Sequence, residues 1–173
     1  MDKKELRAYF KEIRKNIKEK DEKSLIITEK FLNTEIYKNS KTIMLYYPLS
    51  DEVNTLFLFE RAKKDGKKIV FPKTITETRE LIPVLYTNGF VKGAYNIFEP
   101  LGEIFPKECI DVVIVPALSA DSNNFRLGYG GGYYDRFLED FKGKKVTFLF
   151  GELKTDKLPT EETDIKTDIV ITD

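Results

Sequence analysis

The segment from Asp111 to Val115 is an almost unbroken run of β-branched residues that ends at Pro116. Such a run is typical of a central parallel strand whose two faces are both covered by helices. Other strand-like runs alternate with helix-like segments, which favours an α/β fold with three layers (α/β/α) and a largely parallel central sheet. We expect residues 1–173 to form one such domain, because a chain of 173 residues with 41% apolar content can bury a sizeable core.

The spacing of apolar residues predicts the individual elements. Helices are expected over residues 2–18, 21–37, 55–65 and 133–141. Strands are expected over residues 42–47, 68–71, 81–86, 111–115, 145–150 and 168–172. The section from Pro72 to Pro106 contains the turn signals Asn88-Gly89 and Lys92-Gly93, so we expect it to form loops and strands beside the main sheet.

Charge and hydropathy exclude several classes of partner. The chain has 29 basic and 29 acidic residues, so its balance does not favour nonspecific binding of nucleic acid or of an anionic membrane surface. Any site for an anion must therefore be local. The first twenty residues are densely charged, and no apolar run approaches the length of a membrane span. We expect a cytoplasmic protein, and without a heptad pattern a monomer.

The chain contains no histidine, and Cys109 is its single cysteine. These counts exclude an intrachain disulfide, Cys/His zinc sites and every catalytic triad that depends on histidine. Any catalysis must use carboxylates, lysines, arginines, tyrosines, backbone groups or a hard cation.

Four glycines occupy five positions, 128–132, directly before the last predicted helix. Glycine lets backbone N–H groups approach a ligand closely, and the free N–H groups at the start of a helix favour an anion such as phosphate. The run is neither a Walker A motif nor a Rossmann fingerprint, since Tyr133 stands where the third glycine would be. A tight connection between a strand and a helix is the alternative. Asp135 in the first helical turn suits the helix dipole, and beside phosphates it could also hold magnesium.

The segment from Arg126 to Leu138 resembles, without a gap, the signature of 5-formyltetrahydrofolate cyclo-ligases, also called methenyltetrahydrofolate synthetases. The resemblance covers nearly the whole chain. It extends to Lys3-Lys4-Glu5-Leu6-Arg7, Ser50-Asp51-Glu52-Val53, Asn96-Ile97-Phe98-Glu99-Pro100 and the run from Asp111 to Pro116.

The resemblance implies an ATP-dependent ring closure, in which 5-formyltetrahydrofolate becomes 5,10-methenyltetrahydrofolate and ATP becomes ADP and phosphate. Transfer of the γ-phosphoryl group to the formyl oxygen creates an activated imidate that the neighbouring amine attacks intramolecularly. No protein nucleophile is required, because the enzyme needs only to align two substrates and neutralise moving charge. A chain without histidine can do that.

The resemblance also implies roles for particular residues. For ATP these are Lys3, Lys4, Arg7, Arg126, Leu127, Gly128, Tyr129, Gly130, Gly131, Gly132, Tyr133 and Tyr134. For the folate they are Tyr47, Glu52, Tyr129, Gly130, Gly131, Gly132 and Tyr133. Magnesium, the implied cofactor, would be held by Asp135 and Asp164 with ATP oxygens. Family members often have His-Asp where this chain has Thr163-Asp164, and Asp168, which follows closely, is the alternative second ligand.

Each role has a structural alternative. The basic residues of the first helix could form an ordinary solvated face, Arg126 could be a surface charge, and the tyrosines, including Tyr47, could simply fill the core. Glu52 follows a strand end, where α/β sheets bind ligands, but it could instead cap the helix that begins near Thr55.

Two other functional classes remain open. A regulator without catalytic activity could bind the nucleotide and the folate. A phosphosugar isomerase or CoA-transferase-like enzyme could use a related three-layer fold, since a fold does not determine a function.

Overall fold

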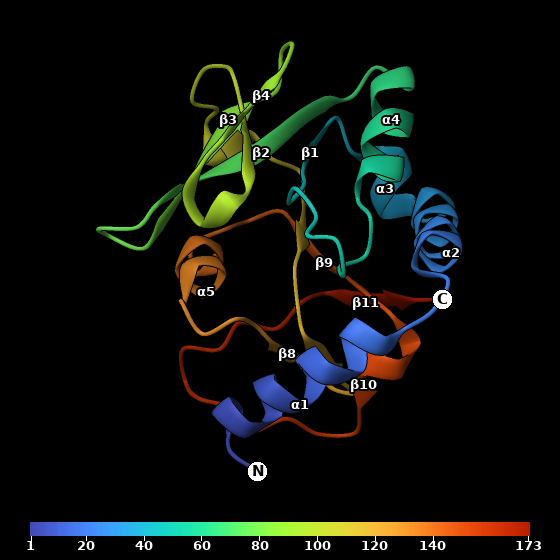
Figure 1. Ribbon diagram of the computed structural model, residues 1–173. Coiled ribbons are helices and arrows are strands. Elements are labelled where there is room, and N and C mark those ends of the chain that lie inside the picture. Colours follow the sequence, from blue (N-terminus) through green and yellow to red (C-terminus); the bar gives the residue numbers. More distant parts are fainter.

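The computed structural model describes all residues, 1–173, and its centre is a six-stranded sheet in the order β11-β9-β6-β1-β2-β3 (Figure 1). The strands are β1 (Thr42–Met44), β2 (Lys68–Ile75), β3 (Glu80–Leu85), β6 (Val112–Val115), β9 (Lys144–Leu149) and β11 (Ile169–Thr172). All neighbouring pairs are parallel except β2 and β3. The prediction of a largely parallel sheet is confirmed.

The β-branched run forms β6, which pairs with β1 on one side and β9 on the other. All four residues of β6 are buried, as expected for a strand covered on both faces. The chain passes from β1 to β2 and β3 on one side, then returns to add β6, β9 and β11 on the other. The order therefore reverses between β1 and β6, and ligands of open α/β sheets bind beyond the strand ends at such a switch point.

Helices cover the two faces of the sheet unequally (Figure 1). One face packs against α2 (Lys20–Leu32), α3 (Glu35–Asn39) and α4 (Leu56–Lys64) in an apolar core of 28 buried residues. The other face packs against α5 (Tyr133–Leu138) in a core of eight buried residues. These two cores confirm the three layers. None of the helices combines the length and the apolar character that crossing a bilayer requires.

The helix α1 (Lys3–Asn16) lies beside these layers, near a small sheet in the order β10-β7-β8 (Figure 1). The strands of that sheet are β7 (Ser119–Asp121), β8 (Arg126–Leu127) and β10 (Lys154–Thr155). A separate hairpin consists of β4 (Phe90–Lys92) and β5 (Phe98–Pro100). Single 3-10 turns are η1 (Ala94–Asn96), η2 (Lys107–Cys109) and η3 (Gly151–Leu153).

Several predicted boundaries were wrong. The helix predicted over residues 21–37 is two helices, because the Thr34 side chain accepts the Tyr37 N–H and starts α3 afresh. The strand predicted over 42–47 ends at Met44, and α5 ends at Leu138 instead of residue 141. The small sheet containing β7, β8 and β10 was not predicted, since strands of two or three residues carry almost no periodic signal.

Candidate functional site

The glycine loop, residues 128–132, connects β8 to α5 and requires glycine at two positions. Gly130 has a φ of +99° and Gly132 a φ of +72°, which L side chains rarely adopt. A Cβ at Gly130 would also lie 3.3 Å from the Arg7 guanidinium carbon. Because α5 has only six residues, its dipole is a weak attraction for an anion. An anion at this loop must therefore be bound mainly by backbone N–H groups and nearby basic side chains.

The helix α1 directs basic side chains toward this loop and its surroundings. It begins at Lys3 because Asp2 and Glu5 form a capping box. One turn later the Arg7 Nε donates to the Gly128 carbonyl oxygen over 3.0 Å. Lys4 is exposed, with no ion pair or side-chain hydrogen bond. The structure thus brings Arg7 against the glycine loop, while Lys4 extends into solvent.

The two predicted magnesium ligands lie on adjoining segments. The Asp135 Oδ1 accepts the backbone N–H of Ile165 over 3.3 Å, which ties α5 to the residue that follows Asp164. The Asp164 Oδ2 accepts from the Lys3 Nζ over 2.6 Å. Asp168 instead accepts the Lys145 N–H at the start of β9. The geometry therefore favours Asp164 over Asp168 as the partner of Asp135.

These residues fit magnesium only in company with a ligand. No group of three or more histidine, cysteine, aspartate or glutamate side chains gathers anywhere in the chain. Magnesium commonly takes one or two carboxylates from a protein and fills its other positions with phosphate oxygens and water. Asp135 and Asp164 match that pattern, although each now pairs with a cation of the protein.

The cation that pairs with Asp135 is Arg126, whose Nη2 lies 3.0 Å from the Asp135 Oδ1. The Arg126 side chain is only 4% exposed, and its buried Nε has no hydrogen-bond partner. Burial lowers the pKa of Arg126. Arg126 therefore lies buried against Gly128 of the glycine loop and pairs with Asp135, so it is not the surface charge of the structural alternative.

Glu52 is buried in the loop that follows β1, and both of its carboxylate oxygens are occupied. Its Oε2 accepts the Leu49 N–H over 2.7 Å, and its Oε1 accepts the Tyr129 hydroxyl of the glycine loop. Burial raises the pKa of Glu52. Glu52 does not cap α4: the side chain that accepts the N–H of Leu56, the first residue of α4, belongs to Asn54. The capping alternative is therefore wrong.

Tyr47 lies in a cluster of aromatic rings beneath the β4–β5 hairpin. Its ring centroid is 5.1 Å from that of Phe90 and 5.0 Å from that of Phe98. The partly buried Tyr47 thus packs against this hairpin, as its structural alternative predicted. Burial raises the pKa of Tyr134, whose ring packs against the smaller core.

The 5-formyltetrahydrofolate cyclo-ligase family model matches residues 1–173, which is the whole chain. The chain belongs to this family. The structure of the 5,10-methenyltetrahydrofolate synthetase of Aquifex aeolicus superposes with a TM-score of 0.88 at 32% identity, covering 99% of this chain and 90% of that one. The synthetase of Mycoplasma pneumoniae superposes with a TM-score of 0.81 at 29% identity, covering 99% of each chain.

A curated relative agrees with these structures. The 5-formyltetrahydrofolate cyclo-ligase of Mus musculus is 29% identical over 165 residues, covering 86% of this chain and 81% of its own. The members of this cyclo-ligase family are enzymes, so the resemblance carried by the glycine run is confirmed at the level of the family.

Two residues near the cyclo-ligase signature were missed by the sequence reasoning. Arg14, in α1, contacts Tyr129 and Asp51. Tyr95, in η1, places its hydroxyl 2.9 Å from that of Tyr133 and is 65% exposed. The spacing of Arg14 from Arg7, two helical turns apart on one face, was an available signal. Tyr95 directly precedes the segment Asn96–Pro100 that carries part of the family resemblance.

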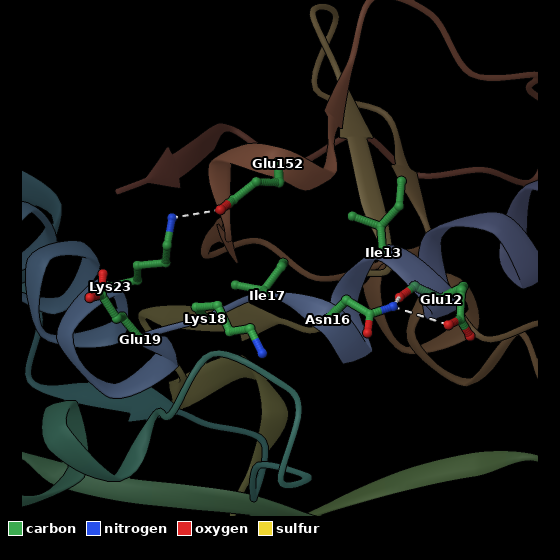
Figure 2. Close-up of a pocket in the computed structure, with 8 residues that line it drawn as sticks. All are labelled: Glu12, Ile13, Asn16, Ile17, Lys18, Glu19, Lys23 and Glu152. Carbon is green, nitrogen blue, oxygen red and sulfur yellow. Dashed lines mark hydrogen bonds and ion pairs between the residues drawn. The ribbon is translucent and has the colours of Figure 1, made fainter.

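A surface depression of about 620 Å³ lies away from the glycine loop of this cyclo-ligase family member (Figure 2). It is lined by the second half of α1, the connection to α2 and Glu152, and Figure 2 shows the Lys23 ammonium reaching the Glu152 carboxylate. None of the predicted site residues lines it. We therefore assign the candidate site to the surroundings of the glycine loop and not to this depression.

Proposed function

We propose that this chain catalyses the ATP-dependent closure of 5-formyltetrahydrofolate to 5,10-methenyltetrahydrofolate, with release of ADP and phosphate. The observation that carries the proposal is the position of the glycine loop. Its residue Tyr129 bonds Glu52, which follows β1, while Arg7 bonds Gly128 and the loop leads directly to Asp135. One loop at the switch point of the sheet therefore touches a folate-side carboxylate and the groups proposed for ATP.

The ATP phosphates would contact the free N–H groups of the glycine loop and the basic side chains of α1. Arg7 is part-buried against the loop, Lys3 is part-buried against Asp164, and Lys4 adds an exposed positive charge on the same helix. Asp135 and Asp164 would hold magnesium, which neutralises the charge on the phosphate oxygens when it is bound. Lys3, once released from Asp164, would be free to contact phosphate.

The folate would bind through Glu52, which in its ionised form only accepts hydrogen bonds. The pterin ring system of tetrahydrofolate presents several N–H donors, so a buried carboxylate can bind and orient it. The rings of Tyr129 in the glycine loop and of Tyr133 at the start of α5 would offer apolar surface for the folate. Tyr47 would contribute from the aromatic cluster.

The reaction needs alignment more than reactive protein groups. The formyl oxygen attacks the γ-phosphorus and ADP leaves. The neighbouring amine nitrogen then attacks the formyl carbon, the carbon–oxygen bond breaks to release phosphate, and the amine loses its proton. Holding the two substrates in line supplies the main acceleration. It remains a prediction that the protein is cytoplasmic, that it is a monomer and that residues 1–173 form a single domain.

The test is to mix the protein with 5-formyltetrahydrofolate, ATP and magnesium and to follow the near-ultraviolet absorbance of the methenyl product together with ADP. We expect equal amounts of the two products and no methenyl product when ATP is omitted. Binding of both ligands without product would favour the regulator. Turnover of another substrate without ATP would favour an isomerase or a transferase.

A further inference from the structure

Arg14 is a buried cation that has no role in the reaction proposed above. Its side chain is 4% exposed, and its two terminal nitrogens point to different partners. Nη2 lies 3.0 Å from the Asp51 Oδ1, while Nη1 donates to the Tyr129 hydroxyl and lies 3.9 Å from the Glu52 Oε1. Arg14 therefore joins α1 to the loop after β1 and to the glycine loop.

The hydrogen bonds that join Arg14, Tyr129 and Glu52 can run in only one direction. Arginine has no acceptor, and an ionised carboxylate has no donor. The Tyr129 hydroxyl must accept from Arg14 and donate to Glu52, as the two hydrogen bonds show. The Arg14 guanidinium also lies 5.4 Å from the centre of the Tyr129 ring. Arg14 and Glu52 thus determine the orientation of Tyr129, a residue that remains 39% exposed.

The burial of the Arg14 guanidinium costs free energy of folding. Buried ion pairs often contribute less to stability than apolar residues of the same volume. The Arg14 Nε is in addition buried without a hydrogen-bond partner. A side chain kept under these conditions calls for an explanation other than stability.

We infer that Arg14 is a positioning residue that orients both Glu52 and Tyr129 for the folate, and so couples the folate-binding carboxylate to the glycine loop. This inference rests on the proposed function. Without Arg14 the Tyr129 hydroxyl loses its fixed hydrogen-bond direction, and Glu52 loses the cation that opposes the effect of burial.

The groups that face Glu52 come from every neighbouring element. They are Arg14 from α1, Asp51 from the same loop, Tyr129 from the glycine loop, Tyr46 from the segment that follows β1 and Tyr134 from α5. Only Arg14 among them is cationic. Its removal must therefore shift the protonation of Glu52 toward higher pH, which an arginine that merely fills space would not do.

The experiment compares Arg14→Met with Lys15→Met, which removes the same charge from the neighbouring, exposed position of α1. The readouts are kcat/KM for 5-formyltetrahydrofolate as a function of pH and, separately, KM for ATP. We expect Arg14→Met to lower kcat/KM for the folate about 30-fold to 100-fold at neutral pH. The acidic limb of its kcat/KM profile should move to higher pH by about one unit. KM for ATP should change far less, and Lys15→Met should match the wild type.

Two further variants complete the test. Arg14→Lys keeps the charge, so we expect it to restore most of the acidic limb and part of kcat/KM. If Arg14→Met does not fold, Arg14→Gln keeps a donor for Tyr129 without the charge, and it should give the same upward movement of the acidic limb. An acidic limb that coincides with that of the wild type in a folded, uncharged variant overturns the inference.

A measurement without turnover separates this inference from the proposed function. The pKa of Glu52 can be followed by carbon-13 NMR titration of labelled glutamate, with Glu52→Gln to assign the resonance. We expect a higher pKa in the uncharged Arg14 variant than in the wild type, and an equal pKa overturns the inference. If the wild type forms no methenyl product, the proposed function fails, while this titration still decides whether Arg14 controls Glu52.

Discussion

The two ends of the glycine loop hold their carboxylates differently. At the folate end, formed by Arg14, Glu52 and Tyr129, the Glu52 side chain is 8% exposed and both of its oxygens are bonded within the protein. At the phosphate end, formed by Lys3, Arg7, Asp135 and Asp164, the carboxylates pair with cations of the same chain. The proposed folate end is therefore preorganised, whereas the contacts of the proposed phosphate end would have to exchange for ATP and magnesium to bind.

The two ion pairs of the phosphate end differ in their exposure to solvent. The Lys3–Asp164 pair is partly open to solvent, with side chains 19% and 15% exposed. The Asp135 partner Arg126 is almost fully buried. An exchange of partners is consequently easy at Asp164 and costly at Asp135, because it would leave a buried guanidinium without its counter-charge.

The largest effect is expected for Asp135→Asn. Loss of a proposed magnesium ligand should lower kcat about 1000-fold, as loss of a group that stabilises transition-state charge commonly does. The free energy of unfolding should also fall, by about 3 kcal/mol, because Arg126 loses its counter-charge. Turnover and urea denaturation measure the two effects.

Asp140→Asn is the matched control for that prediction, since Asp140 lies just beyond α5 and its side chain is 80% exposed. We expect this variant to keep wild-type turnover and to change the free energy of unfolding by less than about 0.5 kcal/mol. Normal turnover of Asp135→Asn would remove Asp135 from the phosphate end.

The next effect should come from Gly130→Ala, which touches both ends of the site. Its positive φ and its contact with Arg7 mean that a methyl group displaces the loop. We expect kcat/KM to fall about 100-fold for ATP and for the folate alike, because the loop positions both. Gly66→Ala is the control, since Gly66 has a φ of +72° but open space around it, and only stability should change. A loss confined to one substrate would show that the loop serves only that one.

Lys3→Met tests the phosphate end alone. Because Lys3 would contact phosphate after leaving Asp164, KM for ATP should rise about tenfold, the usual size of one charge-assisted hydrogen bond. KM for the folate should stay unchanged. The difference from the wild type should shrink at high salt, since salt screens a charge that is partly open to solvent. Lys11→Met, at an exposed position of α1, should leave both KM values as they are. An equal rise in both KM values would contradict the division of the site into two ends.

The fold was predictable where the signal is local. The run Asp111–Val115 identified the central strand β6, and apolar spacing identified α1 and α4 to within two residues of each end. Within the site, the glycine loop and Asp135 were found because glycine content and position in the first helical turn can be read from a few adjacent residues.

The remainder of the site depends on contacts between distant segments. Arg14 and Glu52 are 38 positions apart, and nothing near either residue indicates that the other neutralises it. The burial of Arg126 under the loop could not be foreseen either, because an arginine beside glycines is mostly exposed. Sequence reasoning therefore proposed Glu52 and Tyr129, which the structure brings into contact, but it did not propose Arg14, which lies beside both of them.

The smallest effect concerns the pH dependence of stability at the folate end. Burial raises the pKa of Glu52 above its ordinary value of 4.5, so the folded protein binds this proton more readily than the unfolded chain does. Stability from this group is present below pH 4.5 and is lost as the pH rises through the raised pKa. Glutamine carries no such proton, so the free energy of unfolding of the wild type minus that of Glu52→Gln should fall across this window.

The fall should amount to about 1.4 kcal/mol for each unit by which the pKa is raised. Urea denaturation of both proteins at a series of pH values gives the difference, in which the other titrating groups largely cancel. A difference that rises with pH would mean that Arg14 outweighs burial and lowers the pKa of Glu52. The folate end would then hold its carboxylate as the phosphate end does, by a dominant ion pair, and the contrast between the two ends would reduce to their exposure to solvent.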